Sequence, residues 1–375
     1  MSNIIIKEVL NKRDLKKFID FPNKLYKDNE YYTPLLFMDE MECLQKKTNP
    51  AFEYCDFKLL LAYKDKKIVG RICGIINHHA NKRYNQKRVR FNRIDMIDDI
   101  EVTKALIGAI EAWGKENGLE EINGPLGYSD QDKEGMLIKG FDQYNMFITM
   151  YTHEYYVRHL QELGFVQDAI WNEYKIFMPK EVNPTIKRIA QRVRERYGLR
   201  NVKLKSKKEI QPYVRKALYL VNECYKDLYG FVQLGDEQID HLASQYVPLI
   251  NVDYLQLIEN KEGKLVGLGL MIPSPARALK KSNGRLFPFG FIRFFRALKH
   301  SKVLEMLLVA VDPDYQNKGV NSLIMEEAIE NCIKNKIEYA ETGPELEYNT
   351  AVQSLWKTFE SENHKKRACF LKKID

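Results

Sequence analysis

The sequence lacks a long apolar run. Its longest uninterrupted ones, such as residues 306–311, are far too short to cross a bilayer, which takes about 20 apolar residues in a helix. Residues 1–18 also lack the apolar centre of a signal peptide, because Lys7, Glu8 and Asp14 interrupt them. We therefore expect a cytoplasmic protein.

Cysteine pairs and metal-ligand spacings are also missing. The 6 cysteines stand far apart, which indicates free thiols rather than a disulfide framework. No histidine has partners at the spacing that zinc requires, so we expect no metal site. The histidines considered are His78, His79, His153 and His159.

Three common nucleotide-binding and hydrolase motifs are absent. The sequence has no G-x-x-x-x-G-K-[ST] loop, no G-x-S-x-G elbow and no G-x-G-x-x-G after a strand. NTPase, hydrolase and dehydrogenase functions therefore lose their usual support.

Length, composition and charge are those of an ordinary globular protein. The 375 residues exceed one typical domain and favour two. With 45% hydrophobic and 29% charged residues, the chain can fill real cores. The net charge of +8 is spread evenly without a basic tail, which suits an anionic ligand such as a phosphate-rich cofactor but does not require one. We do not expect nucleic acid as a partner.

Hydrophobic periodicity predicts an α/β fold of two mixed-sheet domains in tandem, with helices on both faces. In both halves a helix precedes a strand hairpin, and further helices lead to a closing strand. The expected helices are 14–25, 101–117, 155–163, 183–198, 208–228, 236–246, 322–335 and 350–359. The expected strands are 57–63, 68–76, 169–178, 254–259, 265–272, 303–311, 338–342 and 367–374. The predicted divisions are a first domain (1–180), a basic connector helix (181–200) and a second domain (201–375).

The most informative stretch, residues 307–321, reads as a buried strand followed by a turn and a helix. A helix start leaves backbone N–H groups unpaired and carries the positive end of the helix dipole, and a turn with glycine lets these groups converge on an anion. Lys318 adds a positive charge there. The alternative is an ordinary capped turn of an α/β domain; we favour a phosphate site.

The turn resembles the signature of the GNAT superfamily of acyl-CoA-dependent N-acyltransferases, which is Gln or Arg, two residues, Gly, one residue, then Gly or Ala. Gln316 and Gly319 match it, whereas Asn321 replaces its last small residue. The order of elements over roughly 202–374 is similar as well. The resemblance implies that acetyl-CoA or a longer acyl-CoA binds through Leu308, Val309, Val311, Gln316, Asn317, Lys318, Gly319, Val320, Asn321 and Asn349.

The resemblance also implies that an amine attacks the thioester directly. We expect acetyl transfer to a primary amine of a small molecule or peptide, with the acyl length left open. Because the amine must first lose a proton, a base or a water chain is needed. Glu305 is the first candidate, with a surface carboxylate as the alternative reading, and Glu341 and Glu347 come next. The family often protonates the leaving thiolate with a late tyrosine; residues 365–371 contain none, so Tyr348 or water would stand in.

The first half lacks a second phosphate loop. Residues 93–101, where it would fall, contain no glycine and carry acidic side chains that would repel a pyrophosphate, namely Asp95, Asp98, Asp99 and Glu101. We therefore predict one CoA site per chain, with the first half shaping the substrate groove or supporting the fold. The alternative function is a non-catalytic protein on the same fold that binds acyl-CoA or docks on an anionic surface.

Residues 275–300 form a basic and aromatic segment between two predicted core strands. They contain seven Lys or Arg, five Phe and no acidic residue. We expect first a helix packed between the domains by its phenylalanines. A lid over an acyl chain, a contact with an anionic membrane surface and a platform for single-stranded nucleic acid are the alternatives.

Overall fold

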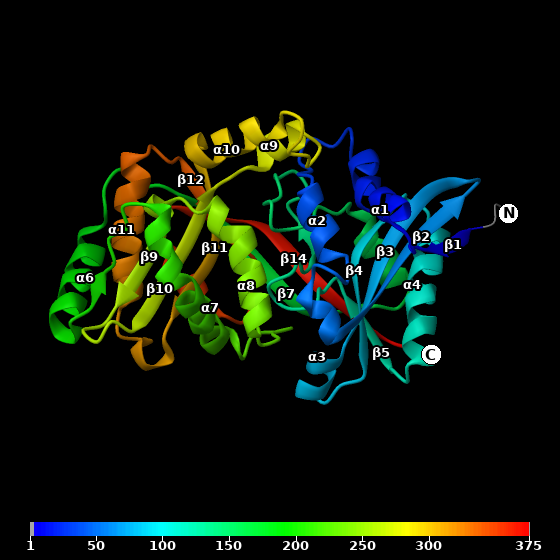
Figure 1. Cartoon of the computed structure of the whole chain (residues 1–375), viewed down its shortest axis with the longest axis horizontal. Helices are drawn as coiled ribbons and strands as arrows, with labels where there is room; N and C mark the ends of the chain where they lie inside the picture. The colour runs from blue at the N-terminus through cyan, green and yellow to red at the C-terminus, as the bar shows by residue number, and fades with distance from the viewer. Residues whose placement is uncertain (1–3, 375) are drawn as a thin grey trace.

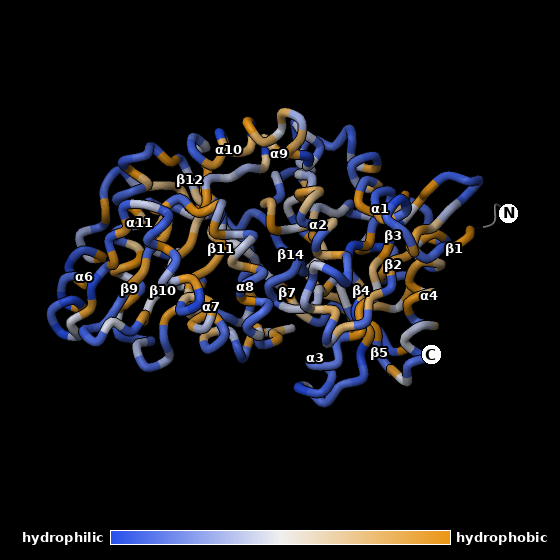
Figure 2. Tube along the Cα trace, viewed as in Figure 1, coloured by the Kyte–Doolittle hydropathy of each residue, from blue (hydrophilic) through white to orange (hydrophobic). Residues whose placement is uncertain are grey.

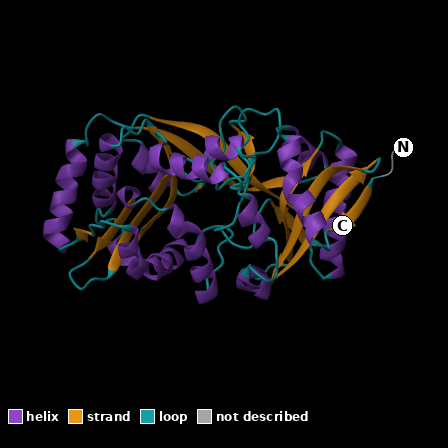
Figure 3. Ribbon diagram, turned by 45° about the horizontal axis from the view of Figure 1, so that its top comes forward, coloured by secondary structure: helices purple, strands orange, loops and turns teal. Residues whose placement is uncertain are grey.

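The computed structural model describes residues 4–374 and confirms an α/β fold with two similar halves (Figure 1). Strands form a mixed sheet, and helices pack on both of its faces (Figure 3). No helix within residues 4–374 combines the length and the apolar character needed to span a membrane.

The first half ends with its longest strand. Its helices are α1 (Lys12–Leu25), α2 (Phe37–Cys43), α3 (His78–Arg83), α4 (Ile100–Glu116) and α5 (Tyr155–Glu162). Its strands are β1 (Ile5–Glu8), β2 (Cys55–Lys64), β3 (Lys67–Asn77), β4 (Arg88–Met96), β5 (Glu121–Gly124), β6 (Met136–Lys139) and β7 (Val166–Phe177).

The second half follows the connector helix α6 (Pro184–Tyr197), which Asn183 caps as the sequence predicts. Its other helices are α7 (Gln211–Tyr225), α8 (Asp236–Tyr246), α9 (Ala276–Lys281), α10 (Gly290–His300), α11 (Asn321–Lys334) and α12 (Thr350–Trp356). Its strands are β8 (Arg200–Asn201), β9 (Leu255–Glu259), β10 (Leu265–Pro273), β11 (Val303–Val311), β12 (Tyr339–Glu341), β13 (Glu345–Leu346) and β14 (Ser361–Lys373).

The strands join into one sheet that crosses both halves. Its main path runs β1-β2-β3-β4-β5-β14-β7-β12-β11-β10-β9-β8, with β6 on β14 and β13 on β7. Buried apolar side chains of the strands pack against the helices that cover them, and in Figure 2 the hydrophobic colour is stronger along β11 than along β14. The sheet therefore provides the core of the whole molecule.

The last strands of the two halves are exchanged. β14 of the second half lies between β5 and β7 of the first half and pairs antiparallel with both. β7 in turn pairs antiparallel with β12 of the second half. In Figure 1, β14 crosses the middle of the molecule in red. Each half of the sheet is thus completed by a strand from the other half, and the predicted domain limits stay a prediction.

Local sequence explains why the elements form where they do. In α4, the side chain of Asp99 accepts a hydrogen bond from the N–H of Glu101, which caps the helix. Val102, Leu106 and Ile110, at helical spacing, are 0% exposed. The helix thus buries one apolar stripe, which packs mainly against β3.

Most predicted elements agree with the structure. α8 and β11 begin and end at the expected residues, and β2 and β3 form the expected antiparallel hairpin. Residues 93–96, at the place where a second phosphate loop would fall, belong to β4. There Arg93 is fully buried, and its guanidinium pairs with Glu40 and Asp132 at 2.8 and 3.0 Å.

The basic and aromatic segment 275–300 forms α9 and α10. Phe294 is buried with Leu279 and Leu298, as expected for a helix packed by its phenylalanines. The other four phenylalanines are exposed, so that expectation was wrong for them.

Candidate active site

β11 and β12 run parallel but soon separate. β12 pairs only with residues 303–305 of β11, and no other strand among residues 4–374 pairs with that edge of β11 as it continues to Val311. A bulge at Leu307 also interrupts its pairing with β10, since Leu270 faces Leu308 and Met271 faces Met306. The separation leaves backbone groups of β11 open to another partner.

A cavity of about 360 Å³ occupies this opening and contacts residues 306–309 of β11. Ala217 of α7 and Ala328 of α11 both line it. α7 packs on the face of β10 that carries Leu268 and Leu270, whereas α11 packs on the face that carries Gly269. The cavity therefore extends to both faces of the sheet, and its walls are mainly apolar, as in ligand-binding pockets.

Tyr225 of α7 covers part of the open strand edge. Its hydroxyl donates a hydrogen bond to the carbonyl oxygen of Val309 at 3.0 Å and accepts one from the Val309 N–H at 3.3 Å. The Cys224 thiol donates to the Val311 carbonyl oxygen at 3.1 Å. Burial raises the pKa of Tyr225, so the phenol stays neutral. These contacts satisfy polar backbone groups that would otherwise face the cavity.

The loop after β11 has the form that the sequence predicts. A short 3-10 helix, Pro313–Tyr315, is followed by Asn317 and Gly319, both at positive φ (59° and 82°). α11 then begins without a side-chain hydrogen bond to cap it. The N–H groups of Gly319 and Val320 make no hydrogen bond with any described residue, so they are free to bind an anion.

The surroundings of this loop are both apolar and charged. A Cβ on Gly319 would lie 3.1 Å from Ile189 and from Val193 of α6, so this position has little room as well as a left-handed backbone. The Lys318 ammonium lies 5.2 Å from the centre of the Tyr315 ring. Asp312, at the other end of the loop, is paired with Lys264 at 2.7 Å.

The residues predicted to bind the cofactor fall into two groups. Leu308, Val309, Asn321 and Asn349 line the cavity. Val311, Gln316, Asn317, Lys318, Gly319 and Val320 lie at the end of β11 and in the loop, outside the cavity lining. Gln316 also donates a side-chain hydrogen bond to the Val311 carbonyl oxygen at 3.1 Å.

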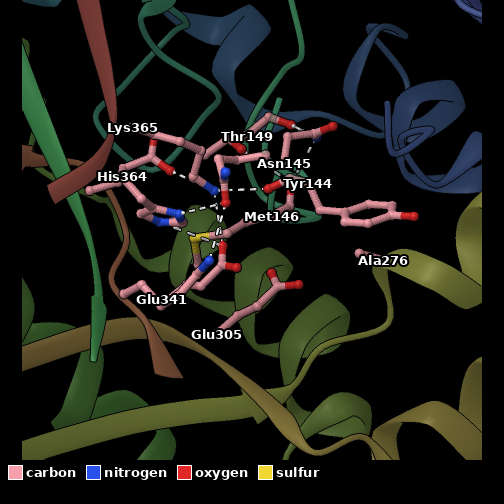
Figure 4. Close-up of polar contacts among 12 residues, drawn as sticks. Tyr144, Asn145, Met146, Thr149, Ala276, Glu305, Glu341, His364 and Lys365 are labelled. Atoms are coloured by element: carbon pink, nitrogen blue, oxygen red, sulfur yellow. Dashed lines mark hydrogen bonds and ion pairs between the residues drawn. The ribbon is translucent and has the colours of Figure 1, made fainter. Parts of the chain in front are cut away.

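The candidate bases Glu305 and Glu341 are neighbours in the register of β11 and β12 and lie side by side (Figure 4). Glu305 is 1% exposed, and it accepts hydrogen bonds from the Ser274 hydroxyl at 2.5 Å and the Phe147 N–H at 3.0 Å. Burial raises the pKa of Glu305 to about 8. Neither carboxylate is among the cavity-lining residues.

Glu341 belongs to a row of buried charges where the exchanged strands meet. Lys365 of β14 lies 2.9 Å from Glu341 of β12 and 3.1 Å from Glu173 of β7. Arg367 also pairs with Glu173. Burial alone would raise the pKa of Glu173, but Arg367 and Lys365 lower this pKa to about 2. The ammonium of Lys365 is thus shared by two carboxylates.

The other predicted catalytic groups lie at the surface. Tyr348 is 64% exposed and does not line the cavity. Glu347 pairs with Lys366 at 3.1 Å, and both side chains are partly exposed. Within residues 4–374, no group of three or more His, Cys, Asp or Glu is arranged to hold a metal ion.

Four carboxylates in the cavity wall were missed by the sequence analysis, and one of them, Asp132, is paired with Arg93 at 3.0 Å. Asp130 and Glu134, from the first half, each have a buried carboxyl oxygen without a hydrogen-bond partner among the described residues. Glu345 accepts a hydrogen bond from the Trp356 indole at 2.8 Å. Burial raises the pKa of Asp130 to about 6 and that of Glu345 to about 8. The acidic run after Gly127 was the only sequence signal, and it does not show which cavity the side chains face.

Comparison with known proteins finds similar sequences for part or nearly all of the chain. Residues 237–360 match the Acetyltransferase (GNAT) family. The chain is 29% identical to Protein YghO of Escherichia coli (strain K12), covering 99% of this chain and 95% of that protein. It is 28% identical to a bacterial ceramide synthase of Caulobacter vibrioides, covering 76% of this chain and 74% of that protein.

Solved structures share the fold. A tandem GNAT protein from the clavulanic acid biosynthesis pathway superimposes with a TM-score of 0.59 at 8% identity, covering 100% of this chain and 99% of that one. A GCN5-related N-acetyltransferase from Sphaerobacter thermophilus gives a TM-score of 0.53 at 9% identity, covering 99% of this chain and 96% of that one. At such identities the likeness establishes the tandem arrangement of the fold and no more.

Proposed function

We propose, on the premise that residues 237–360 belong to the acetyltransferase (GNAT) family within a tandem GNAT fold, that this protein transfers an acyl group from coenzyme A to an amine. The observation that carries the proposal is the opening between β11 and β12, which combines a cavity with backbone groups of β11 that do not pair with β12. One CoA would bind there, in the second half.

The cofactor would lie along β11 with its pyrophosphate at the start of α11. The free N–H groups of Gly319 and Val320, the dipole of α11 and the charge of Lys318 all favour an anion at the loop. The amides of the pantetheine arm would pair with the backbone of Val309. Tyr225, which now holds these groups, would have to turn aside.

The acyl group would enter the apolar part of the cavity. The apolar cavity reaches both faces of the sheet, so it offers a longer acyl chain more contact than an acetyl group would use. The name of the Caulobacter relative supports the same direction, because a ceramide is a fatty amide of a lipid amine. We therefore propose a long-chain acyl-CoA as the donor and an amphiphilic primary amine as the acceptor.

The acceptor ammonium would be held by the carboxylates of the cavity wall. Asp130 and Glu134 have oxygen atoms without partners, and an ammonium group would supply the missing hydrogen bonds. After losing a proton the amine would attack the thioester carbon, the C–S bond would break, and the CoA thiolate would take up a proton. Backbone N–H groups of β11 would stabilise the oxyanion formed in between.

Glu305 and Glu345 are the main candidates for the base that takes the proton from the amine. Glu305 has a pKa near 8, which suits exchange with an amine, but it lies outside the cavity lining. Glu345 has a similar pKa, about 8, and does line the cavity. Glu341 and Tyr348 stay the lesser proposals for the base and for the acid that protonates the thiolate.

Release of free CoA thiol tests the proposal directly. The purified chain would be incubated with acyl-CoA donors from acetyl to palmitoyl and with a panel of primary amines that includes long-chain amines. We expect turnover to rise with donor length, and calorimetry to give one CoA bound per chain. Binding without turnover for every amine would favour the alternative, a non-catalytic acyl-CoA-binding protein. Absence of CoA binding, or two CoA per chain, would refute the single site.

Two matched substitutions locate the acyl chain. Ala328→Phe fills the cavity on the side of α11, and Ala217→Phe fills it on the side of α7. The variant on the side that holds the chain should lose palmitoyl transfer while keeping transfer of the acetyl group, because added volume excludes only the long chain. Equal loss for both donors in both variants would mean that neither side binds the chain selectively.

A further inference from the structure

The segment α9–α10 lies on the upper edge of the molecule in Figures 1 and 2, and it exposes large apolar side chains. Five of them form what we name the apolar patch, and their exposed fractions range from 39% to 70%: Phe287, Phe289, Phe291, Ile292 and Phe295. Phe291 and Phe295 lie one turn apart on α10, with Ile292 beside them. An exposed apolar cluster of this kind marks an interaction surface.

Basic side chains accompany the apolar patch and have no acidic partner. Arg293, Arg296 and Lys299 of α10 are exposed, and they form no hydrogen bond or ion pair with any residue in the described part of the chain. Residues 275–300 contain no Asp or Glu. The surface is therefore apolar and positively charged at once, which favours a partner that is apolar and anionic.

The opposite side of the segment is anchored to the body of the protein. Phe294 and Leu298 pack with Phe147 of the first half. The Arg285 guanidinium forms an ion pair with Asp20 at 2.7 Å. No residue of the apolar patch lines the cavity, so these side chains do not form a lid over it.

We propose that the apolar patch and the basic residues of α10 dock this protein on an anionic lipid membrane. The phenylalanines and Ile292 would enter the interface between headgroups and acyl chains, and Arg293, Arg296 and Lys299 would contact the acidic headgroups. A lipid surface matches this segment better than a protein groove does. The basic residues lie on the same helix as residues of the apolar patch, and an anionic membrane presents many acidic headgroups next to its acyl chains.

The docking surface is close in the chain to the candidate site. α9 starts at Ala276, two residues after Ser274, whose hydroxyl donates a hydrogen bond to Glu305. Docking would therefore bring this end of the candidate site to the membrane, where an amphiphilic acceptor resides. The proposal does not depend on CoA binding, and its test contains no CoA.

Sedimentation with lipid vesicles tests the docking. The full chain should pellet with vesicles that contain phosphatidylglycerol and stay in solution with vesicles of phosphatidylcholine alone, and high salt should weaken the binding. Arg293→Glu/Arg296→Glu should lower the partition coefficient on the order of 30-fold or more, from roughly fivefold for each lost positive charge. Phe291→Ser/Phe295→Ser should lower it at least about tenfold, because the inserted apolar area is lost.

Control variants keep the test specific. Arg188→Glu/Arg192→Glu makes the same charge change on exposed residues of α6, and Val166→Ser removes a side chain that is 63% exposed elsewhere. Both should bind vesicles as the wild type does. Equal losses in the controls would overturn the proposal, as would a wild type that stays in solution. Two other results would also overturn it. One is a wild-type dimer that Phe291→Ser/Phe295→Ser converts to a monomer, and the other is binding of single-stranded DNA in place of vesicles.

Discussion

Replacing Lys365 by methionine tests the buried charges at the joint between the two halves. The ammonium contacts Glu341 at 2.9 Å, Glu173 at 3.1 Å and the carbonyl oxygen of Tyr144 at 3.0 Å, and it is 0% exposed. Methionine retains most of the side-chain volume but none of the charge. Glu173 keeps Arg367 as its partner, whereas Glu341 is left buried without its ion pair.

The expected loss follows from the charge that is left behind. Removing one partner of a buried ion pair costs about 3–5 kcal/mol, because the other charge stays buried without compensation. The Lys365→Met variant should therefore lose about 3–5 kcal/mol of the free energy of unfolding at pH 7.

Urea unfolding followed by tryptophan fluorescence measures this penalty. Lys366→Met is the matched control, because Lys366 is the next residue on β14 and its pair with Glu347 is partly exposed; it should cost less than about 1 kcal/mol. Adding Glu341→Gln to Lys365→Met should recover at least about 2 kcal/mol at pH 7 by removing the stranded charge. A Lys365→Met penalty below about 1 kcal/mol, or no recovery in the double variant, would refute the reasoning.

Two further outcomes concern the candidate site. If Glu305 is the base, the rate of acyl transfer should rise through pH 8, because its carboxylate forms above its pKa of about 8. The Glu305→Gln variant should lower the rate about 100-fold or more. A pH–rate profile that this variant leaves unchanged would remove the role from Glu305 and leave Glu345. Tyr225→Phe should tighten CoA binding roughly fivefold by freeing the backbone of Val309, as calorimetry would measure, and weaker binding would show that the hydroxyl assists the cofactor.

Local patterns predicted the elements of this fold well. Alternation of apolar residues and a charged turn gave the β2–β3 hairpin, and helical spacing gave α4 and α8 close to their observed ends. The strand, turn and helix at residues 307–321 were also expected, since β11 ends at Val311 and α11 begins at Asn321. These features depend on neighbours in the sequence, and the sequence therefore contains their signal.

Contacts between distant parts of the chain could not be predicted in this way. β14 pairs with β5 and β7, yet a strand pattern does not specify its partner. The same holds for Asp130 and Glu134, which reach the cavity only because the first half folds over the second. The phenylalanines of 275–300 likewise fit either a packed or an exposed helix until their neighbours are known.

The exchange of β7 and β14 fixes an order for folding during synthesis. When the ribosome has made the first half, β5 has no neighbour on one side, because its partner β14 is made only with residues 361–373. β7 must likewise wait for β12. Open strand edges attract other chains, so the nascent first half is exposed to misassembly until nearly the whole protein has emerged. We therefore expect this architecture to depend on chaperones during translation.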